Sequence, residues 1–559
     1  MPCSGGMGKE GGRRFRTLRV FGAVFGSRDL RRVCFAYLLF GLAEWATWVA
    51  MLIFAYGQGG PAETGLVAVI QLVPAAIVAP LASIIGDRIR RDRALALGYA
   101  IETVAAGGVA AVLLLDAPVP LVYALAAVLA ASVTLTRPVL SALFPQLART
   151  PDELTAANVA AGTIYSGVVL IGPAAAGALL ALGGTGLVFA ASTGVFLVAL
   201  LLVIRLEPRP APESTTEHPL RQAAAGFSAL ARAPSQRLVV GLLTGQQVIA
   251  GAVDILLVVV ALGLLGLPES GAGYLAAVLG AGGLLGGVWG LGLVGRRHLA
   301  AALGGSILIY GLGTAALALS GVPLITAAFL LVAGSGYVRA DLAGRILLQR
   351  VVPDDVMVRV FGVLEGLSQA ALAVGAAVAP LLVALLGLRG GILATGLLLP
   401  AAIGVLWARI RAVDAAARVP EREIRLLRSL DLFAPLPAPI LEGVASRLAA
   451  VELAAGSRVI REGDVGDRFY VVVDGQLEVT KGGRRVATLG SGQYFGEIAL
   501  LRDVPRTATV TASSRTSLLA LERVDFLEAV TGHALSREAA DAAVRGRMAD
   551  DGGGSTARS

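Results

Sequence analysis

The stretch GQYFGEIALLRDVPRTATVTA, Gly492 to Ala512, decides how the C-terminal part of this chain folds, and it is polar and soluble in character. A turn at Phe495-Gly496 leads into one helical turn that begins at Glu497. Backbone N–H groups at such a helix start can bind a phosphate. Arg506 follows nine residues after Glu497, and its planar guanidinium suits a cyclic phosphodiester through parallel hydrogen bonds. The stretch therefore predicts a phosphate-binding site.

The residues around this stretch predict a small β domain. In RFYVVVDGQLEVT, residues 468–480, β-rich runs flank Asp474-Gly475, which is a hairpin signal. A second hairpin signal stands at Gly482-Gly483. Several short strands about ten residues apart are typical of a β-roll or jelly roll. We therefore expect a small roll with flanking helices over residues 423–535.

Residues 427–530 closely resemble cyclic-nucleotide-binding domains, through the stretch above and through REGDVGDRFYVVVDGQLEV at 461–479. The resemblance implies cAMP or cGMP as a regulatory ligand, with no cofactor in addition. The alternative is a roll that no longer binds. The implied contacts are the N–H groups around Gly496, Ile498 and Ala499 at the phosphate, Arg506 also at the phosphate, Glu497 at the ribose 2′-hydroxyl, and Thr507 at the base or phosphate.

Upstream of the roll the composition is that of a membrane protein. Hydrophobic residues make up 56% of the chain and charged residues 15%, against about a quarter charged in soluble proteins. The 71 glycines suit closely packed membrane helices. The first apolar run begins at about Val33 and ends at about Tyr56, which is too late and too long for a signal peptide. We therefore expect a retained span there.

Further apolar runs long enough to cross a bilayer recur as far as Ile410. They predict an all-α membrane bundle of about twelve helices, arranged as two six-helix halves. The expected spans are 33–56, 63–86, 94–115, 119–143, 156–182, 184–204, 237–266, 271–294, 298–319, 321–345, 358–386 and 389–410.

The connectors between these spans predict the orientation in the membrane. Short connectors nearly without Lys and Arg alternate with arginine-rich ones, such as DRIRRDR at 87–93 and the segment 205–236. Positive charge stays on the cytoplasmic side, so both termini and the roll are expected in the cytoplasm. The net charge of +8 also fits an anionic membrane surface. The lipid bilayer of the cell membrane is thus the expected environment of a multi-pass protein.

An internal repeat supports two related halves. TRPVLSALFPQLARTPDEL (136–154) and VRADLAGRILLQRVVPDDV (338–356) occupy the same place in each half. Related halves predict a secondary transporter whose small-molecule substrate passes between them. The expected organisation is 1–32 basic N-terminus, 33–204 first half, 205–236 cytoplasmic linker, 237–410 second half, 411–422 short linker, 423–535 roll and 536–559 tail.

The loop GDRIRRDRAL at 86–95 resembles the signature loop of the major facilitator superfamily, and GPAAAGALL at 172–180 resembles its Gly-Pro motif in antiporters and drug exporters. The region after Thr136 is similar to the branch of drug and siderophore exporters. The resemblance implies that Asp87 docks on the N-terminus of span eleven, where the helix dipole favours a carboxylate. The alternative is that the loop only anchors the cytoplasmic side by positive charge. The candidate gating residues are Asp87, Arg88 and Arg91 in this loop, and Arg137 and Arg339 at matching repeat positions. For the two repeat arginines the alternative is snorkelling to the cytoplasmic headgroups.

Acidic residues inside the predicted spans are costly, so each needs a reason. Glu44 lies near the middle of span one and Asp254 near the middle of span seven. They are candidates for proton coupling or for pairing a cationic substrate; the alternative is that each only orders the bundle. Glu102 and Glu365 lie about a third of the way into their spans, which favours snorkelling or interhelical pairing over coupling.

These features predict a proton-coupled exporter of a small molecule that is regulated by cAMP or cGMP. The alternative is a membrane-anchored cyclic-nucleotide receptor without transport. Cys3 and Cys34 offer no metal-ligand spacing, and the three histidines are scattered, so no metal site is expected. No Walker A pattern occurs, so we expect no enzyme. No helix-turn-helix follows the roll, so no nucleic-acid partner is expected.

Overall fold

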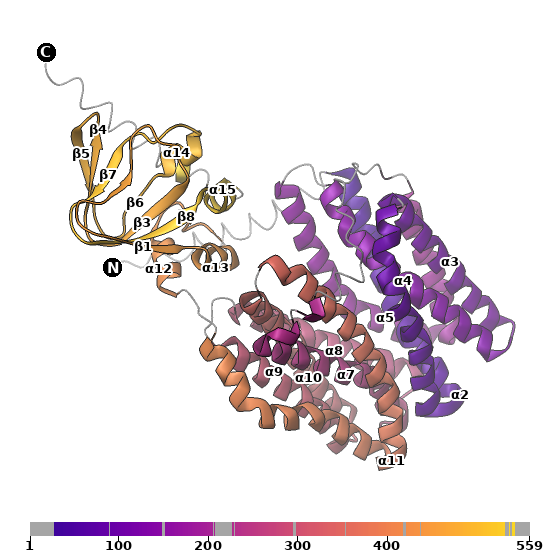
Figure 1. Cartoon of the computed structure of the whole chain (residues 1–559). Coiled ribbons are helices and arrows are strands. Elements are labelled where there is room, and N and C mark those ends of the chain that lie inside the picture. Colours follow the sequence, from indigo (N-terminus) through magenta and orange to yellow (C-terminus); the bar gives the residue numbers. More distant parts are fainter. Residues whose placement is uncertain are drawn as a thin grey trace, which may run out of the picture. The chain divides into compact units, whose positions relative to one another are not determined.

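The computed structural model describes residues 27–88, 90–147, 151–204, 206, 226–228, 230–293, 298–352, 354–416, 421–436, 438–531, 536 and 539–542. The chain divides into two compact units, a helical unit up to residue 417 and a second unit from residue 418. Figure 1 shows long helices in the first unit and strands with short helices in the second.

The helical unit consists of long apolar helices. Nine helices within the described ranges are long and apolar enough to cross a membrane. They are α2 (Arg28–Arg88), α3 (Arg91–Leu114), α4 (Val119–Leu147), α5 (Pro151–Val203), α7 (Pro234–Val259, continued by the π-helical turn η1, Val260–Leu264), α8 (Glu269–Gly290, followed by η2, Leu291–Leu293), α9 (Leu299–Ala316, followed by η3, Leu317–Leu319), α10 (Pro323–Val351) and α11 (Asp354–Ala416).

Glycines interrupt three of these helices. α2 is kinked at Gly59 and Gly60, α5 at Gly183 and Gly184, and α11 at Gly387. One glycine at each kink has a φ between 65° and 72°, a region that side chains other than glycine rarely adopt. The kinks fall in the connectors expected after spans one, five and eleven. The three helices supply apolar segments of 48, 48 and 56 residues, against about 20 for one crossing. The count of twelve crossings stays a prediction.

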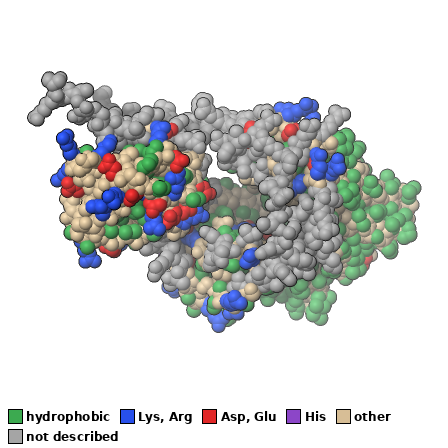
Figure 2. All heavy atoms as spheres, turned by 45° about the horizontal axis from the view of Figure 1, so that its top comes forward, with side chains coloured by type: hydrophobic (Ala, Val, Ile, Leu, Met, Phe, Trp, Pro, Cys, Tyr) green, Lys and Arg blue, Asp and Glu red, His purple; other side chains and the backbone are tan. Residues whose placement is uncertain are grey.

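The outward-facing side chains of the helical unit are largely apolar. Figure 2 shows hydrophobic side chains covering much of this unit, whereas charged side chains are scattered over the second unit. Leu114, Leu182 and Val405 are 76%, 78% and 84% exposed. Apolar surface of this extent is favourable next to lipid tails and unfavourable next to water, which indicates that this unit lies in a membrane.

Glycines also let helices from different parts of the unit approach closely. A Cβ atom at Gly251 of α7 would overlap the carbonyl of Leu372 in α11, and one at Gly375 of α11 would overlap the carbonyl of Val248 in α7. α8 and α10 meet through glycines in the same way. Small residues at such contacts are typical of membrane helices, which explains the high glycine content.

The second unit is a β-roll of two antiparallel four-stranded sheets, ordered β1-β8-β3-β6 and β2-β7-β4-β5. The expected hairpin at Gly482-Gly483 is confirmed, since it joins the paired strands β4 and β5. The expected hairpin at Gly475 is wrong: the turn there passes from β3 in one sheet to β4 in the other, so the two strands do not pair. All three glycines have positive φ. The strands are β1 (Ala449–Leu453), β2 (Arg458–Ile460), β3 (Arg468–Asp474), β4 (Leu477–Lys481), β5 (Arg484–Leu489), β6 (Tyr494–Phe495), β7 (Thr509–Ala512) and β8 (Thr516–Glu522).

Short helices flank the roll and close one of its cores. Phe433 precedes α13, Phe469 lies on β3 and Phe526 on α15, and the rings of Phe469 and Phe526 stack at 4.7 Å. The helices are α12 (Glu421–Ser429), α13 (Ala438–Ser446), α14 (Glu497–Arg502) and α15 (Arg523–Thr531). The expected fold class, a helical membrane bundle followed by a small β-roll with flanking helices, is confirmed.

Candidate functional sites

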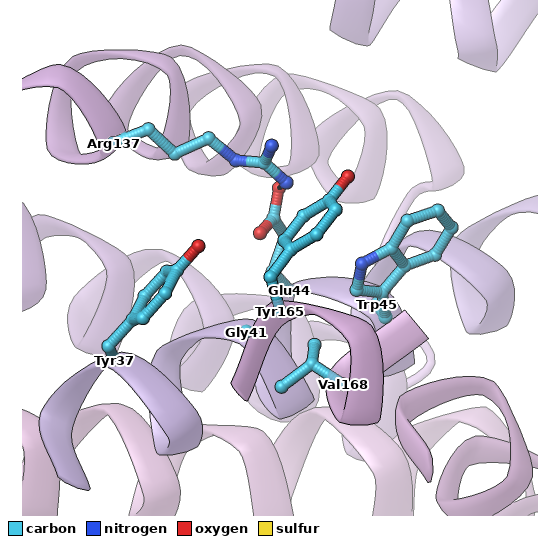
Figure 3. Close-up of a pocket in the computed structure, with 7 residues that line it drawn as sticks. All are labelled: Tyr37, Gly41, Glu44, Trp45, Arg137, Tyr165 and Val168. Carbon is cyan, nitrogen blue, oxygen red and sulfur yellow. Dashed lines mark hydrogen bonds and ion pairs between the residues drawn. The ribbon is translucent and has the colours of Figure 1, made fainter. Parts of the chain in front are cut away.

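The helical unit contains a pocket around an ion pair. Arg137 of α4 places Nη2 at 2.5 Å from Glu44 Oε1 of α2, and its Cζ lies 5.9 Å from the ring centroid of Tyr165 in α5. Figure 3 shows the guanidinium and the carboxylate pointing toward each other. The residues that line the pocket are Tyr37, Gly41, Glu44, Trp45, Arg137, Tyr165 and Val168.

Local sequence explains why the pocket forms between α2 and α5. A Cβ atom at Gly41 would lie 2.7 Å from Val168, and one at Gly172 would lie 2.7 Å from Trp45. These two glycines let the helices approach, and the larger side chains beside them form the walls. Glu44 was predicted from the sequence, but Tyr37 was not, although it shares the helix face of Glu44 at a spacing of seven residues.

The second candidate coupling residue, Asp254, lies on α7. Trp48, one turn after Glu44 on α2, donates a hydrogen bond to the Asp254 carboxylate. Tyr310 of α9 and Tyr337 of α10 also lie near Asp254, and the centroids of their rings are 5.4 Å apart. The structure therefore gives the two acids different surroundings, with an arginine at Glu44 and aromatic side chains at Asp254.

The candidate gating residues are described unequally. The backbones of Asp87 and Arg88 end α2, but their side chains lie outside the described residues, so the docking predicted for Asp87 stays a prediction. Arg91 begins α3. The two repeat-related arginines differ: Arg137 pairs with Glu44, whereas Arg339 Nε has no hydrogen-bond partner among the described residues.

In the β-roll, Arg506 is 3% exposed and is held by three acceptors. Nη2 donates to Asp467 Oδ1 at 2.9 Å and to the Arg468 carbonyl at 2.7 Å. Nη1 donates to the Gly496 carbonyl at 3.1 Å. Sequence analysis did not assign Asp467 or Arg468; they lie 39 and 38 residues from Arg506 and follow the Gly-Asp turn of GDVGDRF.

The backbone at Gly496 explains why a glycine precedes α14. Its φ is 91°, and a Cβ atom there would lie 2.7 Å from Arg506 Nη1. The structure thus brings Gly496 and Arg506 together, as the sequence predicted. The other candidate contacts surround them: Glu497 and Ala499 are buried in α14, Ile498 is half-buried, and Thr507 is exposed.

Tyr470 of β3 adds an aromatic ring to this site. Its ring centroid lies 6.0 Å from Arg506 Cζ, and it stacks on Phe495 at 5.1 Å. Burial raises the pKa of the Tyr470 hydroxyl, with a further contribution from the charge of Asp467. Tyr470 therefore stays neutral at physiological pH.

Curated relatives match a limited part of the chain. The cAMP-dependent protein kinase regulatory subunit of Schizosaccharomyces pombe is 41% identical over 105 residues, covering 19% of this chain and 24% of that protein. A cyclic nucleotide-gated potassium channel of Rhizobium etli is 36% identical over 145 residues, covering 25% of this chain and 40% of the channel. The chain thus spans less than half the length of either relative.

A solved structure, the regulatory domain of Toxoplasma gondii PKA with cAMP, is 27% identical with a TM-score of 0.22, covering 24% of this chain and 52% of that chain. The family model of the cyclic nucleotide-binding domain matches residues 450–533. The model of the Major Facilitator Superfamily matches residues 33–364. The chain therefore belongs to the Major Facilitator Superfamily and carries a C-terminal cyclic nucleotide-binding domain.

Proposed function

We propose that this protein is a proton-coupled exporter of a small molecule in the cell membrane, regulated by cAMP or cGMP. The union of a transporter family and a cyclic nucleotide-binding domain in one chain supports regulation of transport by a nucleotide. The alternation of arginine-rich connectors with connectors nearly without arginine supports cytoplasmic termini. Resemblance to drug and siderophore exporters supports the outward direction.

The observation that carries the transport part is the ion pair of Glu44 and Arg137 inside an aromatic pocket. The Glu44 side chain is 18% exposed and that of Arg137 is 43% exposed, so both can be reached from the pocket. Protonation of Glu44 removes its negative charge and weakens the pair. Arg137 is then free to pair with an acidic or polar group of the substrate. Protonation of Glu44 and binding of the substrate therefore favour each other.

Asp254 is the second coupling residue of this proposal. Its hydrogen bond from Trp48 connects it to the helix that carries Glu44. A change at Glu44 that shifts α2 therefore reaches Asp254 through Trp48. Asp87, Arg88, Arg91 and Arg339 are proposed as gating residues on the cytoplasmic side, together with Arg137.

The nucleotide part rests on Arg506. A buried guanidinium whose position is set by backbone carbonyls is suited to a cyclic phosphate, because it forms charge-assisted hydrogen bonds in a fixed orientation. Under this proposal the N–H groups around Gly496, Ile498 and Ala499 also bind the phosphate, Glu497 binds the ribose hydroxyl, and Thr507 contacts the base or the phosphate.

Reconstitution of the full chain into liposomes tests this function. A panel of amphipathic organic compounds is loaded, a proton gradient is imposed, and efflux is followed with and without cAMP or cGMP on the side of the β-roll. We expect proton-driven transport of at least one compound and a change in its rate on adding nucleotide. Nucleotide binding without any flux would instead favour a membrane-anchored receptor.

A further inference from the structure

Glu102 is a fully buried acid that the proposed function does not use. It lies on α3 with 0% exposure. Thr136 Oγ1 of α4 donates a hydrogen bond to Glu102 Oε1 at 2.7 Å, and Ser132 Oγ lies 3.5 Å from the same oxygen. Oε2 has no hydrogen-bond partner in the part of the chain that the structure describes. Snorkelling is therefore wrong for this residue, because none of its side chain reaches the surface.

Among the residues that the structure describes, the groups that face Glu102 do not include a cation. α4 presents the two hydroxyls, Tyr99 lies one turn earlier on α3, and Glu44 on α2 is close enough for its charge to interact. α5 also packs on α3, and among the described residues it directs no titratable group at Glu102. A carboxylate without a cation is strongly disfavoured at such a place, so Glu102 carries a proton in this conformation.

The contacts of Glu102 are tied to the Glu44 pair through α4. Thr136, which donates to Glu102, directly precedes Arg137, which pairs with Glu44. α3 and α4 touch at this level, because a Cβ atom at Gly98 would overlap Thr136 Oγ1 and Ser132 Oγ donates to the Gly98 carbonyl at 3.1 Å. A movement of α4 that separates Arg137 from Glu44 therefore also disturbs the hydrogen bond to Glu102.

We propose that Glu102 is a third proton-binding site, neutral while α3 and α4 are in contact and ionised when they separate. Only the O–H bond of the acid breaks, and its proton passes to water that enters between the helices. As a step of transport this rests on the proposed proton coupling, and it adds a proton carrier to Glu44 and Asp254.

Infrared spectroscopy of the full chain in liposomes tests the site directly, because it follows protonation of Glu102 without any transported compound or nucleotide. The C=O stretch of a protonated carboxylic acid is recorded across a pH series for the wild type and for Glu102→Gln, which is neutral and nearly isosteric. We expect an acid band that Glu102→Gln lacks and that disappears at alkaline pH. Identical spectra, or a band that persists unchanged at every pH, would overturn the proposal.

Three further variants keep the test decisive. Thr136→Val removes the hydroxyl donor, so the Glu102 band should shift in frequency without being lost, and this variant replaces Glu102→Gln if the latter does not fold. Glu44→Gln should shift the pH at which the band disappears, whereas Glu365→Gln on α11 should not. An unshifted midpoint in Glu44→Gln would refute the link between the two acids.

This measurement is independent of transport. If no compound shows proton-driven flux but the band titrates as expected, the proposed exporter function fails and the proton site stands. If flux is proton-driven but the band is absent or does not titrate, Glu102 is only structural.

Discussion

Arg506 is fixed by its backbone as well as by its side chain. Its N–H donates to the Asp464 carbonyl at 2.8 Å, and its carbonyl accepts from the Gly463 N–H at 2.8 Å. The Gly-Asp turn therefore holds the chain at the point from which the guanidinium enters the domain. Because the side chain is already ordered, little conformational entropy is lost when an anion binds.

Replacing Arg506 with Ala should weaken nucleotide binding by about 1.5–3 kcal/mol, roughly 10- to 150-fold, since it removes a charged hydrogen-bond donor. Calorimetry on the full chain with cAMP and cGMP measures the loss. Arg502→Ala is the matched control, because Arg502 ends α14 and its side chain is 47% exposed. Equal affinity of wild type and Arg506→Ala would remove Arg506 from the phosphate site.

Alanine substitutions at two glycines near the nucleotide site distinguish the effect of backbone strain from the effect of a contact with Arg506. Gly496 and Gly492 have φ of 91° and 80°, but a Cβ atom meets Arg506 only at Gly496. Both Ala substitutions should cost about 1–2 kcal/mol of unfolding free energy, because alanine disfavours the left-handed region. Only Gly496→Ala should also weaken nucleotide binding. Thermal unfolding and calorimetry distinguish the two effects, and equal affinity of both variants would contradict the contact.

Glu44→Gln should abolish proton-driven uphill flux while the protein stays folded and inserted, because the Gln side chain cannot bind and release a proton. The flux assay in liposomes, with the compound that the wild type transports, gives the readout. Glu365→Gln is the control, since Glu365 is 59% exposed and lies 3.7 Å from Arg345 on a different helix pair. Full pH-driven flux in Glu44→Gln would exclude Glu44 from coupling.

At the scale of elements, close contacts between pairs of helices stabilise the bundle. α7 and α11 contact each other through Gly251 and Gly375 at distances that leave no room for a side chain. Such contacts maximise van der Waals packing, which replaces the hydrophobic effect as the attraction between helices in lipid. The pair should therefore tolerate little change in volume at these two positions.

Gly375→Ala should lower the stability of the helical unit by about 1–3 kcal/mol, because its methyl group overlaps the Val248 carbonyl. Thermal unfolding of the detergent-solubilised chain detects the change. Gly366→Ala on the same helix is the control, since a Cβ atom there meets nothing within 4 Å. A Gly375→Ala variant as stable as Gly366→Ala would show that the two helices are not packed as described.

Local signals made much of this fold predictable. Glycine-rich connectors marked the kinks of α2, α5 and α11, and Gly482-Gly483 marked the hairpin of β4 and β5. Gly475 marked a turn but not a hairpin, because β3 and β4 pair in different sheets. The partners of the site residues were not predictable. Glu44 and Arg137 are 93 residues apart, and Asp467 and Arg506 are 39 apart, so packing rather than local pattern selects them.

At the scale of the whole molecule, a short connector joins the two units. α11 ends at Ala416 and α12 begins at Glu421. The end of α11 is fastened within its own unit, because Asp414 accepts hydrogen bonds from the N–H groups of Ala300 and Ala301 at 2.7 and 2.9 Å. The connector therefore leads to a helix end that is hydrogen-bonded to the start of α9.

Lengthening this connector should uncouple the units. A flexible Gly/Ser insert after Ala416 should leave nucleotide affinity unchanged but reduce the effect of nucleotide on flux. The reason is that a flexible linker does not transmit a displacement of α12 to α11. Calorimetry and liposome flux on the same preparation measure both quantities. An insert of equal length within the chain tail after Ser555 is the control. An undiminished nucleotide effect with the insert would mean that the signal takes another route.

The central claim is that nucleotide binding to the β-roll controls transport by the helical unit. The most direct test is the transport rate of the reconstituted full chain at saturating cAMP, at saturating cGMP and without nucleotide, in wild type and Arg506→Ala. A coupling of about 1–3 kcal/mol predicts a rate change of roughly 5- to 150-fold in the wild type. At a nucleotide concentration just high enough to fill the wild-type site, Arg506→Ala should show a rate close to that without nucleotide, because its affinity is roughly 10- to 150-fold lower. A wild-type rate that neither nucleotide changes would contradict the claim.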